Sequence, residues 1–151
     1  LEAGEIELRF AASTGDQQAA LLGSGCHTIG DVAINYGSGA FVLVHVGASP
    51  RRLPGLLTTL LVSRARADGS IEAHYAVEGT VNAAATAIEW AVRRLGIRVH
   101  TSGLDRFLGP DDGRPRRVHF LPAISGVGAP RWDPAARPRF SGDAARAEPR
   151  G

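Results

Sequence analysis

Two stretches of the sequence decide the fold: Thr14-Gly15-Asp16-Gln17-Gln18-Ala19-Ala20-Leu21 and Asn35-Tyr36-Gly37-Ser38-Gly39-Ala40-Phe41. The first predicts a helix that begins at Asp16, because helix-forming residues follow a break of serine, threonine and glycine. The second predicts two strands, at residues 32–36 and 41–46, that are joined by a glycine hairpin. A carboxylate at the start of a helix, next to a tight glycine turn, is the outline of a phosphotransferase site.

Asp16 lies in the first turn of the predicted helix, where Ser13 or Thr14 can act as the cap. Gly23 and Gly25 then end the helix. The partial positive charge of a helix N-terminus keeps Asp16 ionised, ready to orient or deprotonate a hydroxyl. The alternative is that Asp16 is only a carboxylate at the start of a helix, without chemistry.

The turn Gly37-Ser38-Gly39 has the composition of an oxyanion-binding loop. Glycines tolerate positive φ and let a backbone N–H group approach an oxyanion closely. The Ser38 hydroxyl can add a further donor. The alternative is an ordinary hairpin with a convenient turn, because a single G-x-G pattern is not specific.

The rest of the chain alternates strands, helices and loops. We expect a half-buried strand at residues 5–12 and a second hairpin at 56–66 and 70–77, with an Asp-Gly turn. The clearest helix runs from a Thr80 cap to Leu95 and ends at Gly96. We then expect a surface connection at 103–117, a short strand at 118–121 and an irregular segment at 122–137.

Composition excludes several classes of protein. The 151 residues are 44% hydrophobic, which suits a folded domain, and no apolar run reaches the length of a membrane span. All 17 basic residues are arginines, scattered along the chain, so we expect no nucleic-acid partner. The histidines lack metal-ligand spacing, so we expect no metal site built from protein ligands. The lone cysteine, Cys26, indicates a reducing cytoplasm.

The sequence has no methionine and begins with Leu1-Glu2-Ala3-Gly4. We therefore expect it to be part of a longer protein.

In order and wording the motifs resemble the FGGY family of carbohydrate kinases, and its glycerol kinase-like members most closely. Four stretches carry the resemblance: residues 15–21, 36–39, 55–59 and 122–137. The most specific wording is Gly15-Asp16-Gln17-Gln18 and Gly128-Ala129-Pro130-Arg131-Trp132-Asp133-Pro134.

The resemblance implies an α/β fold of the actin-like ATPase (ribonuclease H-like) class, here partial, with β-hairpins and a packed helix. Residues 1–25 then correspond to the end of the N-terminal kinase domain and residues 26–142 to the start of the C-terminal one. We expect residues 143–151 to be a disordered tail.

The resemblance also assigns roles to residues at the substrate site. Asp16 matches the general base that acts on a polyol or sugar hydroxyl, and Gln17 matches a neighbour that contacts the substrate. Phe41 matches an aromatic residue that packs against the carbon backbone of glycerol.

Nucleotide contacts are implied for Gly37, Ser38 and Gly39, with ATP as the phosphate donor and with Mg²⁺ held largely by ATP. Ala85 and Glu89 fall where the family often has glycine and glutamine near the nucleotide. These two departures leave the contacts there open, because Glu89 brings a negative charge close to phosphates.

The implied function is ATP-dependent phosphorylation of a polyol hydroxyl, glycerol to glycerol 3-phosphate. The partners would be glycerol or a related polyol or sugar, and the full-length protein could be a homo-oligomer. We expect the 151 residues alone to be inactive. Two alternatives stay open: a non-catalytic relative that binds sugar or a partner, which Ala85 and Glu89 favour, and an unrelated arginine-rich interaction module.

Overall fold

The computed structural model describes residues 13–110 and 117–142. The predicted strand at 5–12 and the predicted tail at 143–151 lie outside this part of the chain. The elements in chain order are α1 (Asp16–Gly23), β1 (Val32–Tyr36), β2 (Ala40–Gly47), β3 (Leu57–Ala65), β4 (Ile71–Val81), α2 (Ala85–Arg94), the 3₁₀ helix η1 (Thr101–Gly103), α3 (Leu104–Leu108), β5 (Val118–Leu121) and β6 (Arg139–Gly142).

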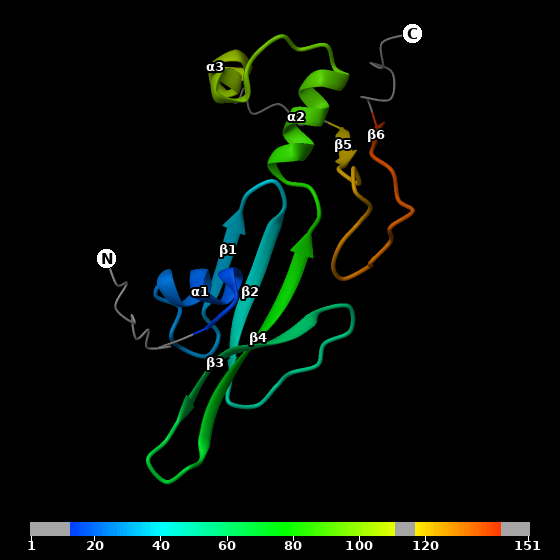
Figure 1. Ribbon diagram of the computed structural model, residues 1–151. Coiled ribbons are helices and arrows are strands. Elements are labelled where there is room, and N and C mark those ends of the chain that lie inside the picture. Colours follow the sequence, from blue (N-terminus) through cyan, green and yellow to red (C-terminus); the bar gives the residue numbers. More distant parts are fainter. Residues whose placement is uncertain (1–12, 111–116, 143–151) are drawn as a thin grey trace, which may run out of the picture.

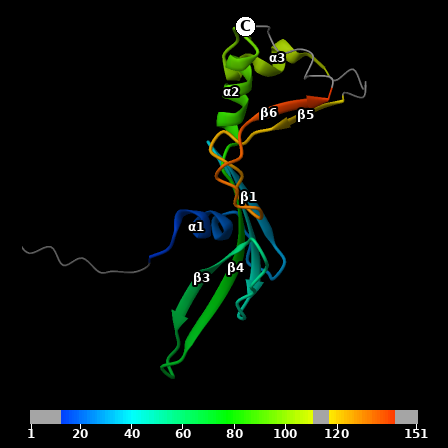
Figure 2. The same cartoon turned by 90° about the vertical axis from the view of Figure 1, so that its right-hand side faces the viewer.

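The centre of the molecule is an antiparallel sheet with the strand order β1-β2-β4-β3. It consists of two hairpins that pair through β2 and β4. Helix α1 lies across one face of this sheet (Figures 1 and 2). The β3–β4 hairpin extends away from α2, so the molecule is elongated along its strands (Figure 1).

The core lies between α1 and the sheet. Leu21 of α1 and Leu43 of β2 are fully buried. They cluster with Ala33, Leu61 and Ala76, one from each of the other strands. Each buried leucine stabilises the fold by about 1.5–3 kcal/mol relative to an exposed one, so this cluster is what holds α1 on the sheet.

The predicted start of α1 at Asp16 is confirmed, but the predicted cap is wrong. Gly15 occupies the N-cap position in an extended conformation and its carbonyl accepts the N–H of Ala19 at 2.9 Å. No side chain caps this end. Ser13 and Thr14 precede the N-cap, and a capping side chain must sit at that position to reach the first free amides.

The predicted strand at residues 32–36 is confirmed, and the one at 41–46 runs from Ala40 to Gly47. The predicted helix start at Thr80 is wrong. Thr80 and Val81 belong to β4, where they pair with Phe41 and Ala40 of β2. The helical spacing after residue 80 predicted a helix, but pairing with a distant strand keeps these two residues extended.

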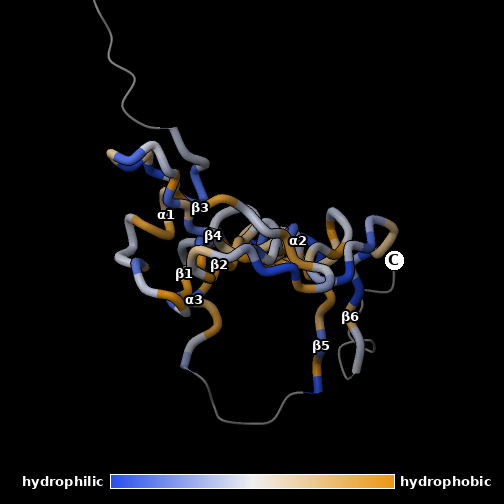
Figure 3. Tube along the Cα trace, turned by 90° about the horizontal axis from the view of Figure 1, so that it is seen from below, coloured by the Kyte–Doolittle hydropathy of each residue, from blue (hydrophilic) through white to orange (hydrophobic). Residues whose placement is uncertain are grey.

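Beyond the sheet, α2 packs against a second, two-stranded sheet of β5 and β6 (Figure 2). The ring of Trp90 stacks on Phe120, with centroids 5.5 Å apart, and Phe120 stacks on Phe140 at 4.6 Å. Along β5 the trace carries both hydrophobic and hydrophilic residues (Figure 3), and its half-buried residues are the last two, Phe120 and Leu121. β5 confirms the predicted strand, whereas β6 and α3 are elements that the sequence did not predict.

None of the helices within residues 13–110 and 117–142 has both the length and the hydropathy that crossing a bilayer requires.

Candidate active site at the start of α1

Asp16 is exposed at the start of α1, where its carboxylate is held by the next residue. Its Oδ1 accepts the backbone N–H of Gln17 at 2.8 Å. Its Oδ2 lies 3.5 Å from the side-chain Nε2 of Gln17. Both carboxylate oxygens therefore have a donor from the same neighbour, and the carboxylate still faces solvent, where a substrate hydroxyl can reach it.

Two side-chain hydrogen bonds attach this end of α1 to the sheet. Asn35 Nδ2 of β1 donates to Gln17 Oε1 at 2.7 Å. Gln18 Nε2 donates to Thr59 Oγ1 of β3 at 2.9 Å. Both bonds are partly buried, so they fix the first turn of the helix across the face of the sheet, between its two edge strands.

Phe41 lies on the same face of the sheet as this first turn. It is paired with Asn35 across the β1–β2 hairpin, and it is half-buried against the core cluster. The structure thus brings Asp16, Gln17 and Phe41 to one corner of the fold. Asn35 belongs to this corner too, although the sequence did not mark it. The sequence feature that could have identified Asn35 is the two-residue period of β1, which places its side chain on the same face as buried Ala33.

The predicted turn Gly37-Ser38-Gly39 follows directly after this corner. Glycines tolerate positive φ, but neither Gly37 nor Gly39 has a positive φ in the structure. At Gly39 the requirement is space, because a Cβ atom there would lie 2.6 Å from the carbonyl oxygen of Val81. The turn is therefore pressed against the end of β4.

The first turn of α2 is bound to the carbonyl groups of this hairpin. Ala84 N–H donates to Ser38 O at 2.7 Å, and Ala85 N–H donates to Gly37 O at 3.1 Å. The hydroxyl of Thr86 adds a bond of 2.9 Å to Ser38 O. These bonds explain why α2 has no side-chain cap, and they bring Ala85 against the hairpin while Ser38 stays exposed.

Glu89 is not brought to the hairpin in the same way. It lies one turn beyond Ala85 on α2 and is exposed. No hydrogen bond or ion pair joins it to Gly37, Ser38 or Gly39, all of which the structure describes. Glu89 is thus only four residues after Ala85 in the sequence, but its carboxylate takes no part in the hydrogen bonds between α2 and the hairpin.

The segment at 122–137 is irregular, as predicted, and hydrogen bonds attach it to β4 and to the loop before β3. Trp132 Nε1 donates to Gly55 O at 2.6 Å, and Ala129 N–H donates to Thr80 O at 2.9 Å. Asp133 Oδ1 accepts the amides of Ala135 and Ala136 at 2.9 and 3.1 Å. The tryptophan and aspartate of this sequence motif therefore have structural roles here.

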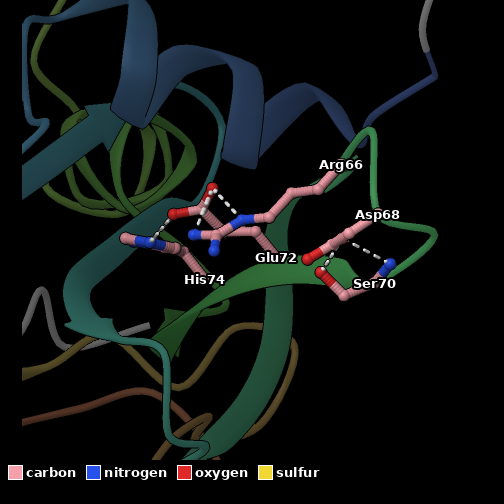
Figure 4. Close-up of polar contacts among 5 residues, drawn as sticks. All are labelled: Arg66, Asp68, Ser70, Glu72 and His74. Carbon is pink, nitrogen blue, oxygen red and sulfur yellow. Dashed lines mark hydrogen bonds and ion pairs between the residues drawn. The ribbon is translucent and has the colours of Figure 1, made fainter.

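A second polar cluster lies toward the far end of the β3–β4 hairpin (Figure 4). Arg66 forms an ion pair with Glu72 at 3.1 Å, and His74 Nε2 lies 3.7 Å from the same carboxylate. The hydrogen bond and the charge of Arg66 hold the pKa of Glu72 below its ordinary value of 4.5. Hydrogen bonds from Ser70 likewise lower the pKa of Asp68.

His74 also connects this cluster to the interior. Its Nδ1 lies 2.9 Å from Nε2 of His45, which is buried. Within residues 13–110 and 117–142, however, no three histidine, cysteine, aspartate or glutamate side chains gather closely enough to hold a metal ion. The cluster orders the hairpin and does not form a metal site from described residues.

Comparison with known proteins identifies the class. Residues 32–149 match the model of the C-terminal domain of the FGGY family of carbohydrate kinases. A glycerol kinase from Citrifermentans bemidjiense is 37% identical over 138 residues, which cover 90% of this chain and 26% of that protein. A glycerol kinase from Myxococcus xanthus is 40% identical over 134 residues, which cover 87% of this chain and 26% of that protein.

Among solved structures, a glycerol kinase from Plasmodium falciparum with ADP matches with a TM-score of 0.68 and 29% identity. The match covers 85% of this chain and 24% of that one. The fold is thus that of the carbohydrate kinases with an actin-like ATPase architecture. The chain belongs to the FGGY family of carbohydrate kinases. It spans about a quarter of the length of the curated relatives that it matches.

Proposed function

We propose that this chain contributes the base and part of the nucleotide site of an ATP-dependent kinase that converts glycerol to glycerol 3-phosphate. The observation that carries the proposal is the placement of Asp16. Its carboxylate is exposed, is held by two donors from Gln17 and is linked through Asn35 to the strand that leads into the glycine hairpin. A base and a phosphate-binding turn on adjoining elements suit phosphoryl transfer, which depends mainly on positioning.

In the proposed reaction Asp16 accepts the proton of the substrate hydroxyl. The hydroxyl oxygen forms a bond to the γ-phosphorus of ATP, and the bond from that phosphorus to the β,γ-bridging oxygen breaks. ADP leaves with the bonding electron pair. Gln17 contacts the substrate and Phe41 packs against its carbon chain. A positioned base of this kind contributes about 10² to 10⁴ in rate.

The nucleotide phosphates would lie at Gly37, Ser38 and Gly39. The carbonyl groups of Gly37 and Ser38 already accept hydrogen bonds from α2, whereas the Ser38 side chain is exposed and can meet a phosphate oxygen. Ala85 lies beside the same turn. The exposed carboxylate of Glu89 repels phosphate, so we infer that it weakens nucleotide binding.

Mg²⁺ would accompany ATP and neutralise charge on its phosphates. The described residues contain no cluster of three ligands for it, which suits an ion that keeps several waters and is held largely by the phosphates.

Further proposals concern the whole protein. Because the matched relatives are about four times longer, we propose that the 151 residues do not turn over substrate alone. The family model begins at residue 32, and a domain division near residue 25 stays a prediction. So do a cytoplasmic location and a homo-oligomeric full-length form.

The test measures ATP consumption by the full-length protein that contains this chain, with a panel of polyols and sugars. We expect glycerol to drive turnover and Asp16→Asn to lower kcat by about 10² to 10⁴. Asp105→Asn is a matched control, because Asp105 also lies in the first turn of a helix, α3, and is exposed. Full activity of Asp16→Asn would disprove the base assignment.

A second candidate is a non-catalytic relative that keeps the fold to bind sugar or a partner. The exposed carboxylate of Glu89 favours it. If no substrate drives turnover of the wild type, and Glu89→Gln restores ATP binding measured by calorimetry, this second function replaces the first.

A further inference from the structure

The side chain of Asn35 joins the two halves of the proposed site. It projects from the end of β1, two residues before Gly37, and it donates to Gln17 Oε1 at 2.7 Å. It also pairs with Phe41 across the hairpin. Asn35 therefore touches the residue that holds the carboxylate, and it stands beside the turn where phosphates would bind.

This contact determines which way the amide of Gln17 faces. Because Asn35 Nδ2 is a donor, the oxygen of the Gln17 amide must point toward it. The NH₂ group of Gln17 must then point away from Asn35, and it lies 3.5 Å from Asp16 Oδ2. The flipped amide would set two NH₂ groups against each other and an oxygen lone pair against the carboxylate.

We propose that Asn35 is a positioning residue for the reaction: it orients the Gln17 amide so that its NH₂ group faces the Asp16 carboxylate. This inference rests on the proposed role of Asp16. Asn35 and Gln17 are both half-buried, so their hydrogen bond is shielded from competition by water. The distance of 3.5 Å between Gln17 and Asp16 leaves room for tightening, and catalytic hydrogen bonds often shorten when the substrate binds.

Other charged groups near Asp16 and Gln17 must be distinguished from Asn35 as the cause of a change in the pH profile. Glu78 of β4 lies on the same face of the sheet and its Oε1 is 3.5 Å from Thr80 Oγ1. From β3 the neighbour is Thr59, which carries no charge, and α1 brings no titratable residue other than Asp16. Buried His45 of β2 is paired with Ala76, which is paired in turn with Thr59, and its Nε2 lies 2.9 Å from His74 Nδ1. Arg66 follows the end of β3 and forms an ion pair with Glu72 (Figure 4).

The decisive substitution is Asn35→Asp, which keeps the shape of the side chain but replaces the donor with an acceptor. The Gln17 amide must then turn its NH₂ group toward residue 35 and its oxygen toward Asp16. We expect kcat for glycerol to fall by up to about 100-fold, the cost of a misplaced catalytic group. We also expect the acid limb of the kcat/KM profile to move to higher pH, while KM for ATP stays within about twofold. Asn35→Ala, which leaves the Gln17 amide free to turn, should lower kcat less than Asn35→Asp does.

The matched control is Thr59→Val. It removes the other hydrogen bond between α1 and the sheet, from Gln18, but it does not touch Gln17 or Asp16. It should lower the melting temperature and leave the pH profile as in the wild type. Asn35→Asp also brings a second negative charge near Asp16, which by itself moves the acid limb to higher pH. A merely structural role of Asn35 is therefore judged by Asn35→Ala, which adds no charge and would then behave as Thr59→Val does.

A measurement independent of turnover uses the ¹⁵N-labelled 151-residue chain. The side-chain amide signals of Gln17 should shift in Asn35→Asp and stay unchanged in Thr59→Val. If Asn35→Asp does not fold, Gln17→Glu replaces it, because glutamate still accepts from Asn35 but cannot donate to Asp16. That variant should move the acid limb in the same direction.

The outcomes separate the two proposals. If Asp16→Asn abolishes turnover while Asn35→Asp keeps the wild-type kcat and pH profile, the role of Asn35 is overturned and the base stands. The same holds if Gln17→Glu, used in its place, leaves the profile unchanged. If Asp16→Asn stays fully active, the proposed function itself fails, whatever the Asn35 variants do.

Discussion

Gly39 offers the sharpest test of how the hairpin is built. A Cβ atom at this position would lie 2.6 Å from Val81 O, 3.4 Å from Asn82 O and 3.5 Å from the carbonyl carbon of Asn82. All three are backbone atoms, so they cannot turn aside as the end of a flexible side chain can. Because φ at Gly39 is not in the left-handed region, Gly39→Ala isolates the cost of space from the cost of backbone strain.

To reach an ordinary contact distance, Val81 O or the turn must shift by most of an ångström. Overpacking of this kind typically costs about 1–3 kcal/mol. At about 2–4 °C per kcal/mol for a protein of this size, Gly39→Ala should melt between about 2 and 12 °C below the wild type. Since the same shift would move Ser38, affinity for ATP should also fall in the full-length protein.

The control is Gly37→Ala, two residues earlier in the same turn. Its added Cβ would meet only Gly39 O, at an ordinary 3.8 Å. The stability of this variant should stay within about 0.5 kcal/mol of the wild type, or rise slightly because alanine restricts the unfolded chain. Urea denaturation of both variants, followed by tryptophan fluorescence, measures the difference. Equal midpoints for Gly39→Ala and Gly37→Ala would refute the close approach.

Two further predictions concern the sheet. Leu21→Ala should lower the free energy of unfolding by about 2–5 kcal/mol, because Leu21 is fully buried between α1 and the strands; a smaller loss in urea denaturation would mean that α1 is loosely held. Glu72→Gln tests the ion pair with Arg66. The pKa of Glu72 is lowered in the folded state, so its stabilising effect is present above the ordinary value of 4.5 and is lost as pH falls through the folded value. The melting temperature of Glu72→Gln should therefore be below that of the wild type at pH 7, and the difference should disappear as the pH falls through the lowered pKa of Glu72; a difference that persists in acid would contradict the assignment.

The sequence predicted those parts of the fold that depend on local signals. The β3–β4 hairpin follows from its Asp-Gly turn, where Gly69 has a φ of 80°. The end of α2 follows from Gly96, with a φ of 67°. In both cases the glycine that adopts the left-handed conformation is also the residue that indicates the turn or the helix end in the sequence.

The start of α2 could not be predicted in this way. Its first amides are satisfied by the carbonyls of Gly37 and Ser38, which lie more than 40 residues earlier in the chain. No capping side chain marks the helix start, because none is needed. The sequence therefore placed the cap at Thr80, which is a plausible capping residue but is held in β4 by Phe41.

The proposed base could be identified from the sequence, whereas its support could not. Asp16 and Gln17 are adjacent, so a motif contains both, but Asn35 is 18 residues away and precedes a glycine turn, where asparagine is common. Only the packing of α1 on the sheet, through Leu21, brings Asn35 to Gln17. It follows that substitutions at Leu21 and at Asn35 should differ in kind. Loss of Leu21 weakens the attachment of the whole helix and lowers stability, while loss of the Asn35 donor leaves the helix in place and changes only how the carboxylate is presented to a substrate.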